Sequence, residues 1–174
     1  QTYELLQNLL FWARSQTGTL EFNPVPFDLS ERIGENIALV KSQAEKKNIG
    51  ITHSCTEVKT ALGDVNMIDT VLRNLLTNAI KFTPKRGTVI VQVKESGDKW
   101  EITVKDSGVG ITPENMARIF RVDSKFTRQG TDKERGTGLG LILCMGFARL
   151  HGSMIYVESE PGKGSEFRFS LARG

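Results

Sequence analysis

The sequence predicts an α+β domain in which helices are layered on one face of a β-sheet, with a helical stub at the amino end. Two observations predict this fold. Two pairs of neighbouring segments alternate apolar and polar residues around short turns, which is typical of β-hairpins. Other segments repeat apolar residues at the period of an amphipathic helix, which must bury that face against another layer.

The first half of the chain is expected to contain three helices and three short strands. The segment "TLEFNPVPFDL" has two prolines, which suits an edge strand, and Asp28 or Ser30 is expected to cap the helix that follows. The expected elements in chain order are a helix over residues 2–17, this edge strand, a helix to about Lys47, a strand over 49–55, a short extended piece over 61–63 and a helix over 65–82.

The second half is expected to consist mainly of two hairpins and two helices. Pro84 stops the preceding helix because proline cannot continue its backbone hydrogen bonds. "GTVIVQVKES" and "KWEITVKDS" form one hairpin around "SGD", and "SMIYVESEPGKGSEFRFSLA" forms the other. A short helix over residues 113–120 and a longer one over 139–151 are expected, whereas residues 121–136 show no clear period.

Composition excludes several classes of protein. The 174 residues suffice for one domain and an extra segment, and 39% hydrophobic and 25% charged residues are normal for a globular protein. A net charge of +3 with mixed signs gives no support for nucleic-acid binding. No apolar run is long enough to cross a membrane, and no signal peptide is visible. Cys55 and Cys144 form no CxxC pair, which favours buried free thiols in a reducing compartment.

The amino end indicates a fragment of a longer protein. The chain has no initiator Met and starts almost inside a helical pattern, with Leu5, Leu9 and Trp12 on one stripe. A wide apolar face without a neighbouring partner suggests a helical hairpin or bundle cut at this point. The alternative is a helix that packs on its own domain. We expect residues 1–18 to be this helical segment and residues 19–174 to be the folded domain.

The helix "NLLTNAIKF" contains a polar stripe beside its apolar one. Asn74, Asn78 and Lys81 group within an arc of roughly 60° on the helical wheel. Such a stripe is usually a solvated face, but asparagine is a mediocre helix former and an uncommon choice there. Amide oxygens suit Mg²⁺ and lysine suits phosphate, so the stripe is a candidate phosphate and metal site.

The segment "VKDSGVGIT" follows a predicted strand with Asp106, Gly108 and Gly110. A tight turn after a strand explains these residues in the simplest way. The functional interpretation is a purine pocket, in which a buried carboxylate accepts a hydrogen bond from the exocyclic amine of adenine. The glycines would let a flat ring lie close to the backbone.

The segment "RGTGLGL" places Gly136, Gly138 and Gly140 at the start of a predicted helix. Three glycines at alternate positions are poor helix formers, but a helix start with exposed N–H groups binds phosphate well. The segment matches neither a P-loop nor a dinucleotide fingerprint. The polar stretch before it is either a lid over phosphate, contacted through Lys125, Arg128 or Arg135, or a solvated loop.

Taken together, these stretches resemble the catalytic ATP-binding domain of sensor histidine kinases, in the GHKL group with DNA gyrase B and the heat-shock-90 chaperones. "NLLTNAIKF" resembles the N box, "DSGVG" the G1 box, "IFRVDSKF" the F box and "GTGLGL" the G2 box, in that order. The resemblance extends over about residues 27–171. It implies the Bergerat fold, a two-layer α/β sandwich with a mixed sheet and helices on one face. The amino-terminal segment would be the end of the second dimerisation helix.

The resemblance also implies roles for individual residues. Asn78 would ligate Mg²⁺, Asp106 would bind the adenine amine and Phe120 would anchor the lid. The residues implied to bind ATP are Asn74, Asn78, Lys81, Phe82, Asp106, Gly108, Gly110, Ile111, Lys125, Gly136, Thr137, Gly138, Leu139 and Gly140. ATP and Mg²⁺ are therefore the expected cofactors.

Position 74 and the histidines indicate the kind of ATP chemistry. Hydrolysing relatives have a glutamate base where this chain has Asn74, and an amide cannot serve as a base, so we expect slow hydrolysis and phosphoryl transfer to a histidine. His53 and His151 do not match a phosphoacceptor and are expected to be structural, so the acceptor would lie on a helical hairpin absent from this chain.

The expected partners follow from the same resemblance. They are ATP, the protein's own phosphoacceptor hairpin and a response-regulator receiver domain, without nucleic acid. We expect a homodimer in the intact kinase, a monomer for this chain, and a cytoplasmic location, with membrane anchoring of the parent left open. Three alternatives are a hydrolysing ATPase, a non-catalytic interaction scaffold and a serine kinase acting on a regulatory protein.

Overall fold

The computed structural model describes residues 21–174 except residues 56, 122–128, 135 and 137. The helix predicted over residues 2–17 lies outside the described residues, and so does the boundary expected at residue 18. Lys125 and Thr137, two of the residues implied to bind ATP, also lie outside them.

Seven strands and four helices are found in the described part of the chain. In order they are β1 Val25–Asp28, α2 Leu29–Lys46, β2 Gly50–His53, β3 Thr60–Gly63, α3 Val65–Phe82, β4 Thr88–Ser96, β5 Lys99–Asp106, α4 Pro113–Met116, α5 Gly140–Leu150, β6 Tyr156–Glu160 and β7 Gly164–Arg173.

The strands form one mixed sheet in the order β1-β3-β7-β5-β4-β2. β2 pairs in parallel with β4, and the other pairings are antiparallel. One edge of β7 pairs along its length with β5, and the other is shared between β3 at Ala172–Arg173 and β6 at Gly164–Arg168. The proline-containing strand β1 lies at the edge of the sheet, as predicted.

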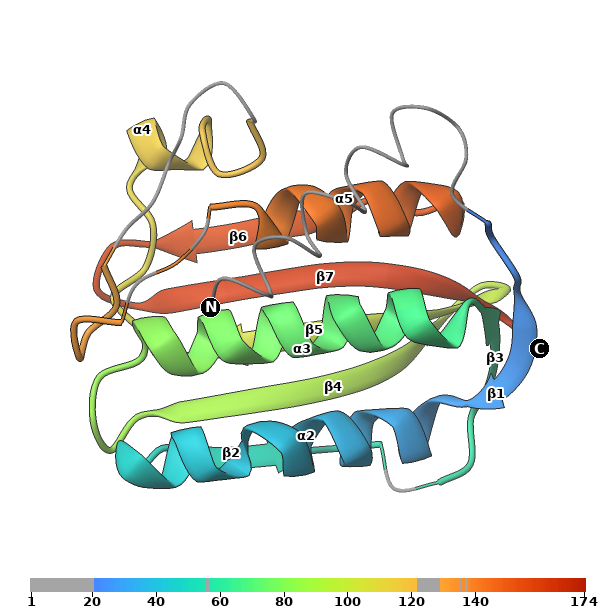
Figure 1. The fold of residues 1–174 in the computed structure, drawn as a ribbon, viewed down its shortest axis with the longest axis horizontal. Coiled ribbons are helices and arrows are strands. Elements are labelled where there is room, and N and C mark those ends of the chain that lie inside the picture. Colours follow the sequence, from blue (N-terminus) through green and yellow to red (C-terminus); the bar gives the residue numbers. More distant parts are fainter. Residues whose placement is uncertain (1–20, 56, 122–128, 135, 137) are drawn as a thin grey trace.

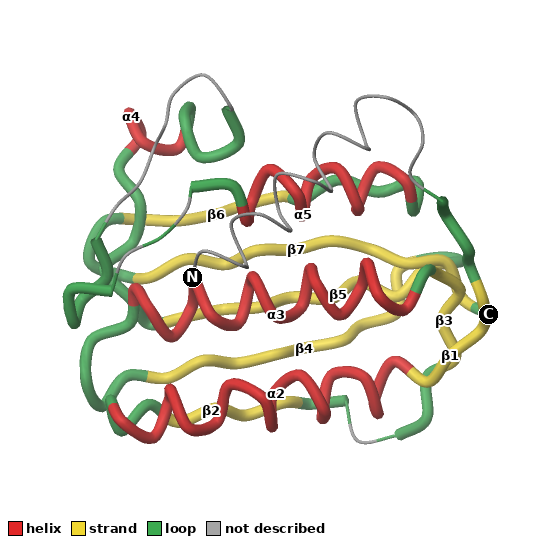
Figure 2. The backbone as a smooth tube through the Cα atoms, in the orientation of Figure 1, coloured by secondary structure: helices red, strands yellow, loops and turns green. Residues whose placement is uncertain are grey.

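Helices α2, α3 and α5 lie side by side over one face of the sheet (Figure 1). Figure 2 shows the same two layers, with the long strands running behind the helices. The predicted two-layer α+β sandwich is therefore confirmed. The buried residues of α3 are Met67, Ile68, Asp69, Val71, Leu72, Leu75, Leu76, Ala79 and Ile80. Most of this face is apolar, and its burial fixes the rotation of α3 about its axis.

The helix ends follow local capping chemistry. Asp28, the first of the two residues proposed to cap α2, accepts a hydrogen bond from the Ser30 amide at 2.9 Å. Asp64 caps α3 in the same way, through the Met67 amide at 3.2 Å. Thr83 ends α3 just before Pro84, and its hydroxyl donates to the Ala79 carbonyl at 2.6 Å.

The helix predicted over residues 113–120 is shorter than expected. α4 ends at Met116, and turns continue to Phe120. The hydrogen bonds there mix two patterns, because the Asn115 carbonyl accepts from the Arg118 amide (i→i−3) at 2.9 Å and from the Ile119 amide (i→i−4) at 3.1 Å. The prediction of a continuous helix was therefore wrong over its second half, although the turns keep the chain compact.

A polar cluster joins α2 to α3. The Arg32 guanidinium forms two hydrogen bonds with the Asp69 carboxylate, one of them from Nε to Oδ1 at 3.1 Å. This pairing raises the pKa of Arg32. Asn36, which is buried, donates to the same carboxylate at 2.8 Å. A two-pronged contact of this kind sets the register between the two helices more strictly than apolar packing alone.

Two further sequence predictions can be compared with the structure. Cys55 and Cys144 are buried and free, as expected. In the part of the chain that the structure describes, no helix combines the length and the apolar character needed to cross a membrane.

Candidate functional site

The polar stripe of α3 lies beside the buried face, where the apolar contacts hold it. Asn74, Asn78 and Lys81 are all half-buried. The amide nitrogen of Asn74 donates to the Thr70 carbonyl at 2.9 Å, and its oxygen lies towards Gly140. A Cβ atom added to Gly140 would lie 2.5 Å from that oxygen. The stripe of α3 and the first residue of α5 therefore meet, although 66 residues separate them in sequence.

Lys81, two helical turns after Asn74, contacts the glycine segment. A Cβ atom added to Gly136 would lie 2.5 Å from Lys81 Nζ. The same ammonium lies 4.8 Å from the centre of the Phe82 ring. The pKa of Lys81 is lowered, because desolvation outweighs the opposite effect of the negative charge of Glu134. A half-buried ammonium beside glycine backbone is suited to an anion, because a bound anion offsets the unfavourable desolvation.

α5 begins at the last of the three glycines. Leu139 occupies its N-cap position, and a leucine side chain cannot accept a hydrogen bond from the first turn. Gly138 has φ +75°, which a residue with a side chain rarely adopts. The start of α5 thus combines the positive end of a helix dipole with backbone that only glycine fits, next to Asn74 and Lys81.

Asp106 ends β5 and is 5% exposed. Its Oδ1 atom accepts hydrogen bonds from the amides of Gly108 at 2.8 Å and Ser165 at 3.2 Å. Burial raises the pKa of Asp106 to about 6, although these two hydrogen bonds act in the opposite direction. The antiparallel register places Ser165 of β7 directly opposite Asp106, so the sheet itself holds the carboxylate.

The loop after Asp106 packs tightly against the end of α3. A Cβ atom on Gly108 would lie 2.5 Å from Asp106 Oδ1 and 2.6 Å from the Phe82 carbonyl oxygen. The Val109 amide donates to the same carbonyl at 3.1 Å. Gly110 has φ +67°, and a Cβ atom there would collide with the backbone of Glu160. These glycines are thus required by protein packing, and their predicted contact with a base remains a prediction.

Two other residues implied to lie in the site, Ile111 and Phe120, pack against the core and are half-buried. The Ile111 amide donates to the Ser159 hydroxyl at 2.9 Å.

In the described residues, the contacts above bring the N-box stripe, the G1 loop and the G2 glycines to one end of the sheet, where α3 ends and α5 begins.

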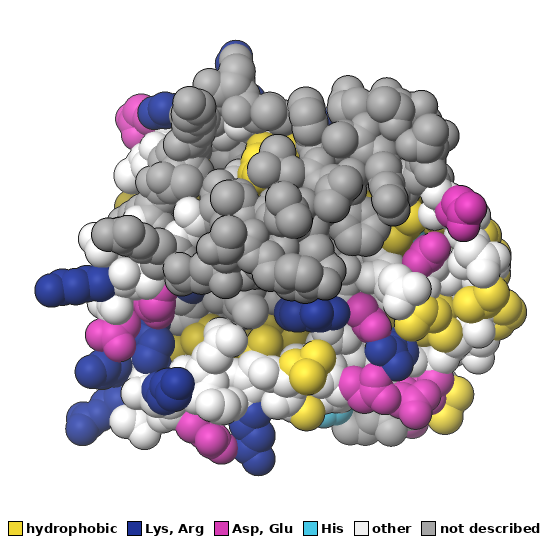
Figure 3. Space-filling model, viewed as in Figure 1, with side chains coloured by type: hydrophobic (Ala, Val, Ile, Leu, Met, Phe, Trp, Pro, Cys, Tyr) yellow, Lys and Arg dark blue, Asp and Glu magenta, His cyan; other side chains and the backbone are white. Residues whose placement is uncertain are grey.

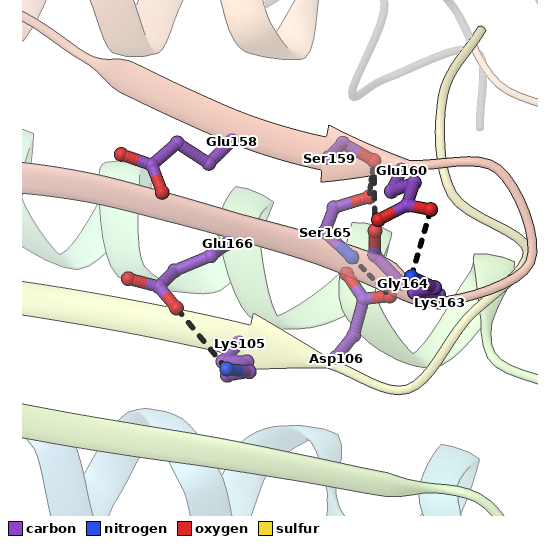
Figure 4. A pocket seen from close by; sticks show the side chains of 9 residues that line it. All are labelled: Lys105, Asp106, Glu158, Ser159, Glu160, Lys163, Gly164, Ser165 and Glu166. Carbon is purple, nitrogen blue, oxygen red and sulfur yellow. Dashed lines mark hydrogen bonds and ion pairs between the residues drawn. The ribbon is translucent and has the colours of Figure 1, made fainter.

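A polar hollow lies near the end of β5, on the side of the sheet shown in Figure 4. Its lining is Lys105, Asp106, Glu158, Ser159, Glu160, Lys163, Gly164, Ser165 and Glu166. Two ion pairs lie within the hollow, Lys105 with Glu166 at 3.4 Å and Lys163 with Glu160 at 2.8 Å. The third glutamate of the lining, Glu158, pairs with Arg168, so the hollow does not suggest a second site.

His151 is held by the backbone through both ring nitrogens. Nε2 accepts a hydrogen bond from the Asp64 amide at 2.9 Å, so the neutral ring has its proton on Nδ1, which faces the Phe147 carbonyl at 2.7 Å. Phe22 packs edge-on against the ring. His151 therefore has the structural role predicted for it. His53 lies exposed on β2.

Sequence reasoning missed three polar residues next to the site. Lys47, Thr131 and Glu134 come together beneath the end of α3. Lys47 follows two other charged residues in "EKK", which reads as a solvated helix end, so its burial had no local signal.

The comparisons with known proteins agree with this geometry. A profile of the histidine kinase-, DNA gyrase B- and HSP90-like ATPases matches residues 63–174, and the chain therefore belongs to this family. Within it, the chain has the sequence and fold of a histidine kinase catalytic domain. The adaptive-response sensory kinase SasA of Thermosynechococcus vestitus is 34% identical over 97% of this chain.

Two solved histidine kinases have the same fold. Full-length ShkA in complex with AMPPNP has a TM-score of 0.84 and 28% identity over 98% of this chain. ThkA in complex with the response regulator protein TrrA has a TM-score of 0.73 and 26% identity over 99% of this chain. The chain spans 44% of SasA, 36% of the ShkA chain and 49% of the ThkA chain, less than half of each.

Proposed function

We propose that this domain binds Mg-ATP and donates the γ-phosphate to a histidine on a dimerisation helix outside the chain, as one step of two-component signalling. The observation that carries the proposal is the meeting of Asn74 and Lys81 with Gly140 and Gly136. An amide oxygen, an ammonium and a glycine-rich helix start then converge, which is the chemistry that a polyphosphate requires.

Each part of the site would have a distinct task in this function. Asp106 would accept the hydrogen bond of the adenine amine, because its Oδ1 is already held by two backbone amides and the carboxylate faces a buried environment. Lys81 and the amides at the start of α5 would bind the phosphates. The catalytic effect would come mainly from positioning and charge neutralisation.

The residues present fit Mg²⁺ through their donor chemistry. Asn78 is half-buried one turn after Asn74, and a neutral amide oxygen is a hard ligand suited to this ion together with phosphate oxygens. Mg²⁺, when bound, would neutralise charge on the phosphates. Asn78 would hold the ion, and Lys81 would bind on the same stripe of α3.

Phosphoryl transfer is favoured over hydrolysis by the chemistry of Asn74. Its amide nitrogen donates to the Thr70 carbonyl, and neither end of an amide can take a proton from water at neutral pH. A water molecule near the γ-phosphate would therefore lack a base at this position. Steady release of phosphate by the chain alone, at rates typical of the hydrolysing members, would favour the rival interpretation.

The proposal also extends to the partners and the location of the protein. By analogy with ThkA, which has been solved with a response regulator protein, we propose that the phosphate passes from the acceptor histidine to a receiver domain. We further propose a homodimer in the intact kinase, a monomer for this chain and a cytoplasmic location.

The experiment that tests the proposal is calorimetric titration of the 174-residue chain with AMPPNP, with and without Mg²⁺. Asn78→Ala should remove most of the Mg²⁺-dependent gain in affinity while leaving the unfolding temperature nearly unchanged, since the side chain is half-buried. Asn66→Ala is the matched control, because Asn66 is an exposed asparagine on the same helix.

Two outcomes would overturn the assignment. Full Mg²⁺ dependence in Asn78→Ala would remove the metal role from this residue. Failure of the parent chain to bind AMPPNP would support a non-catalytic scaffold. Transfer is tested separately by adding a helical hairpin with the cognate histidine and measuring acid-labile phosphate on it.

A further inference from the structure

Lys47 differs from the charged residues around it because it is buried. It follows the last residue of α2 and is 4% exposed, whereas Lys46 is exposed. Lys and Arg side chains gather on the surface at this end of the helix-bearing face (Figure 3). A lysine is rarely buried without partners, so the contacts of its ammonium group explain its place in the fold.

Two of these contacts are with the last turn of α3. Lys47 Nζ donates to the carbonyl oxygens of Ile80 at 2.8 Å and Lys81 at 3.1 Å. Carbonyl groups in the last turn of a helix lack partners within the helix and lie at the negative end of its dipole. The ammonium therefore caps the helix that carries the candidate phosphate-binding stripe.

The other two contacts are with the segment that precedes the G2 glycines. Lys47 Nζ lies 2.6 Å from Thr131 Oγ1 and 3.0 Å from Glu134 Oε1. An ammonium has three hydrogens for these four acceptors, so at least one hydrogen is shared. One buried charge thus joins three elements: the end of α2, the end of α3 and residues 130–134, which we call the stem.

The stem is a compact turn that lies directly against Lys81. The Gly130 amide donates to the Glu134 carbonyl at 2.9 Å, which closes the turn. The Thr131 amide donates to the Lys81 carbonyl at 3.0 Å, and its hydroxyl lies 2.9 Å from the Thr83 carbonyl oxygen. A Cβ atom on Gly130 would lie 2.6 Å from Lys81 Cγ. The stem and the backbone of Lys81 therefore form one packed unit.

We propose that Lys47 is a positioning residue for the phosphate end of the site: by holding the stem to the last turn of α3, it sets Gly136 against Lys81. Gly136 follows Glu134 by two residues, so the position of the stem determines where the G2 glycines begin. Without the ammonium, two helix carbonyls and the Glu134 carboxylate lose their shared partner, and only the Thr131 hydrogen bonds and the packing of Gly130 still hold the stem to α3. This inference rests on the proposed function for its consequence on ATP, but not for its structural part.

The structural part is tested without nucleotide by hydrogen exchange on the 174-residue chain. Lys47→Met keeps a long apolar side chain in the buried site and removes the ammonium. We expect the amides of Gly130 and Thr131 to exchange about tenfold faster, while the amides in the middle of α3 are unaffected. Lys46→Met is the matched control and should leave both regions as in the parent. Unchanged exchange of the stem in Lys47→Met would overturn the proposal.

The functional part is tested by comparing two ligands by calorimetry. AMPPNP should bind Lys47→Met about tenfold more weakly than the parent, which corresponds to about 1.4 kcal/mol. Adenosine, which has no phosphate, should bind with the same affinity within about twofold, because the Asp106 end does not contact the stem. Equal weakening of both ligands would indicate general damage and would contradict a positioning role.

A second variant covers the case in which Lys47→Met does not fold. Glu134→Gln removes the negative charge that pairs with the ammonium, on a partly exposed side chain, and should give the same ligand selectivity with a smaller effect. If the parent chain binds neither ligand, the proposed function fails, whereas the exchange measurement still decides whether Lys47 holds the stem.

Discussion

At the scale of single residues, the stability of the fold and the proposed role of Asp106 in binding adenine make opposite demands on this carboxylate. Its pKa rises from 3.8 to about 6 because it is buried, which corresponds to roughly 3 kcal/mol of unfavourable free energy for the ionised form. The folded state binds the proton more tightly than the unfolded state. The contribution of Asp106 to the free energy of unfolding therefore decreases as the pH rises from about 4 to about 6, and it stays low at higher pH.

Asp106→Asn should therefore stabilise the chain while weakening nucleotide binding. The amide oxygen can still accept from Gly108 and Ser165, and the buried charge is gone. We expect a gain of about 1–2 kcal/mol in the free energy of unfolding at pH 7.5, and a smaller gain at pH 4.5, by urea denaturation. An equal gain in the free energy of unfolding at both pH values would show that the buried charge is not the cause.

The same pKa predicts how binding depends on pH. Affinity of the parent chain for AMPPNP should fall as the pH drops below about 6, because the protonated carboxyl is a weaker acceptor for the adenine amine. The Asp106→Asn variant should bind more weakly at pH 7.5 and lack this step. Calorimetry between pH 5 and pH 8 measures the affinity of the parent chain and of the variant. An identical pH profile in the variant would assign the loss of affinity below pH 6 to another group.

The sequence indicated some residues of the site and concealed others for a physical reason. Asn74, Asn78 and Lys81 were visible because a single helix brings them together, and Asp106 because it ends a strand before glycines. Lys47 was not visible, since its partner Thr131 lies 84 residues away. Ser165, which supports Asp106, lies 59 residues away from it. Contacts of this range depend on the packed fold and leave no local pattern.

At the scale of elements, two glycines allow a direct comparison of packing with helix propensity. Gly108 lies in the loop after β5, where a Cβ atom would lie 2.6 Å from the Phe82 carbonyl oxygen. Gly34 lies inside α2, and a Cβ atom there would meet nothing within 4 Å.

Alanine should therefore have opposite effects at the two positions. Gly108→Ala should lower the free energy of unfolding by about 1–3 kcal/mol, because neither the carboxylate nor the helix end can move freely. Gly34→Ala should raise it by about 0.5–1 kcal/mol through better helix propensity. Chemical denaturation measures the stability of both variants. A loss of stability in Gly34→Ala would show that the added methyl group collides with a neighbour of α2.

Helices and strands were predictable where a regular spacing of apolar residues or a helix-breaking proline determines their bounds. α3 has the predicted bounds of residues 65–82, because its apolar stripe is long and Pro84 follows. The length of α4 was overestimated, because the residues after Met116 keep the composition of a helix while their hydrogen bonds mix the i→i−3 and i→i−4 patterns. The Arg32–Asp69 pair that aligns α2 with α3 had no signal, since it joins separate helices.

At the scale of the whole molecule, the sheet order creates the site. β5 and β7 are neighbours, so the end of one strand meets the start of the other at Asp106 and Ser165. α3 and α5 lie over this region on the same face (Figure 1). The hairpins were predictable from alternation, whereas the parallel pairing of β2 with β4 was not, because α3 and β3 lie between them in sequence.

A ligand that binds across these elements should stabilise the molecule as a unit. With Mg²⁺ and AMPPNP at about 100 times Kd, linkage gives about 2.7 kcal/mol, or a rise of roughly 5–10 °C in Tm for a chain of this size. Scanning calorimetry should show this rise in the parent chain and a much smaller one in Asp106→Asn at the same concentrations. No rise in the parent chain would contradict nucleotide binding.

The two hydrogen bonds of His151 have a consequence for its reactivity as a nucleophile. An imidazole attacks phosphorus with the lone pair of its unprotonated nitrogen, and in His151 that lone pair is already engaged by the Asp64 amide. Its other nitrogen carries the proton directed to Phe147. To attack phosphorus, Nε2 of this histidine would first have to lose its hydrogen bond with the Asp64 amide. The ring could therefore act as a nucleophile only where the start of α3 separates from the end of α5, since this bond joins the two helix ends.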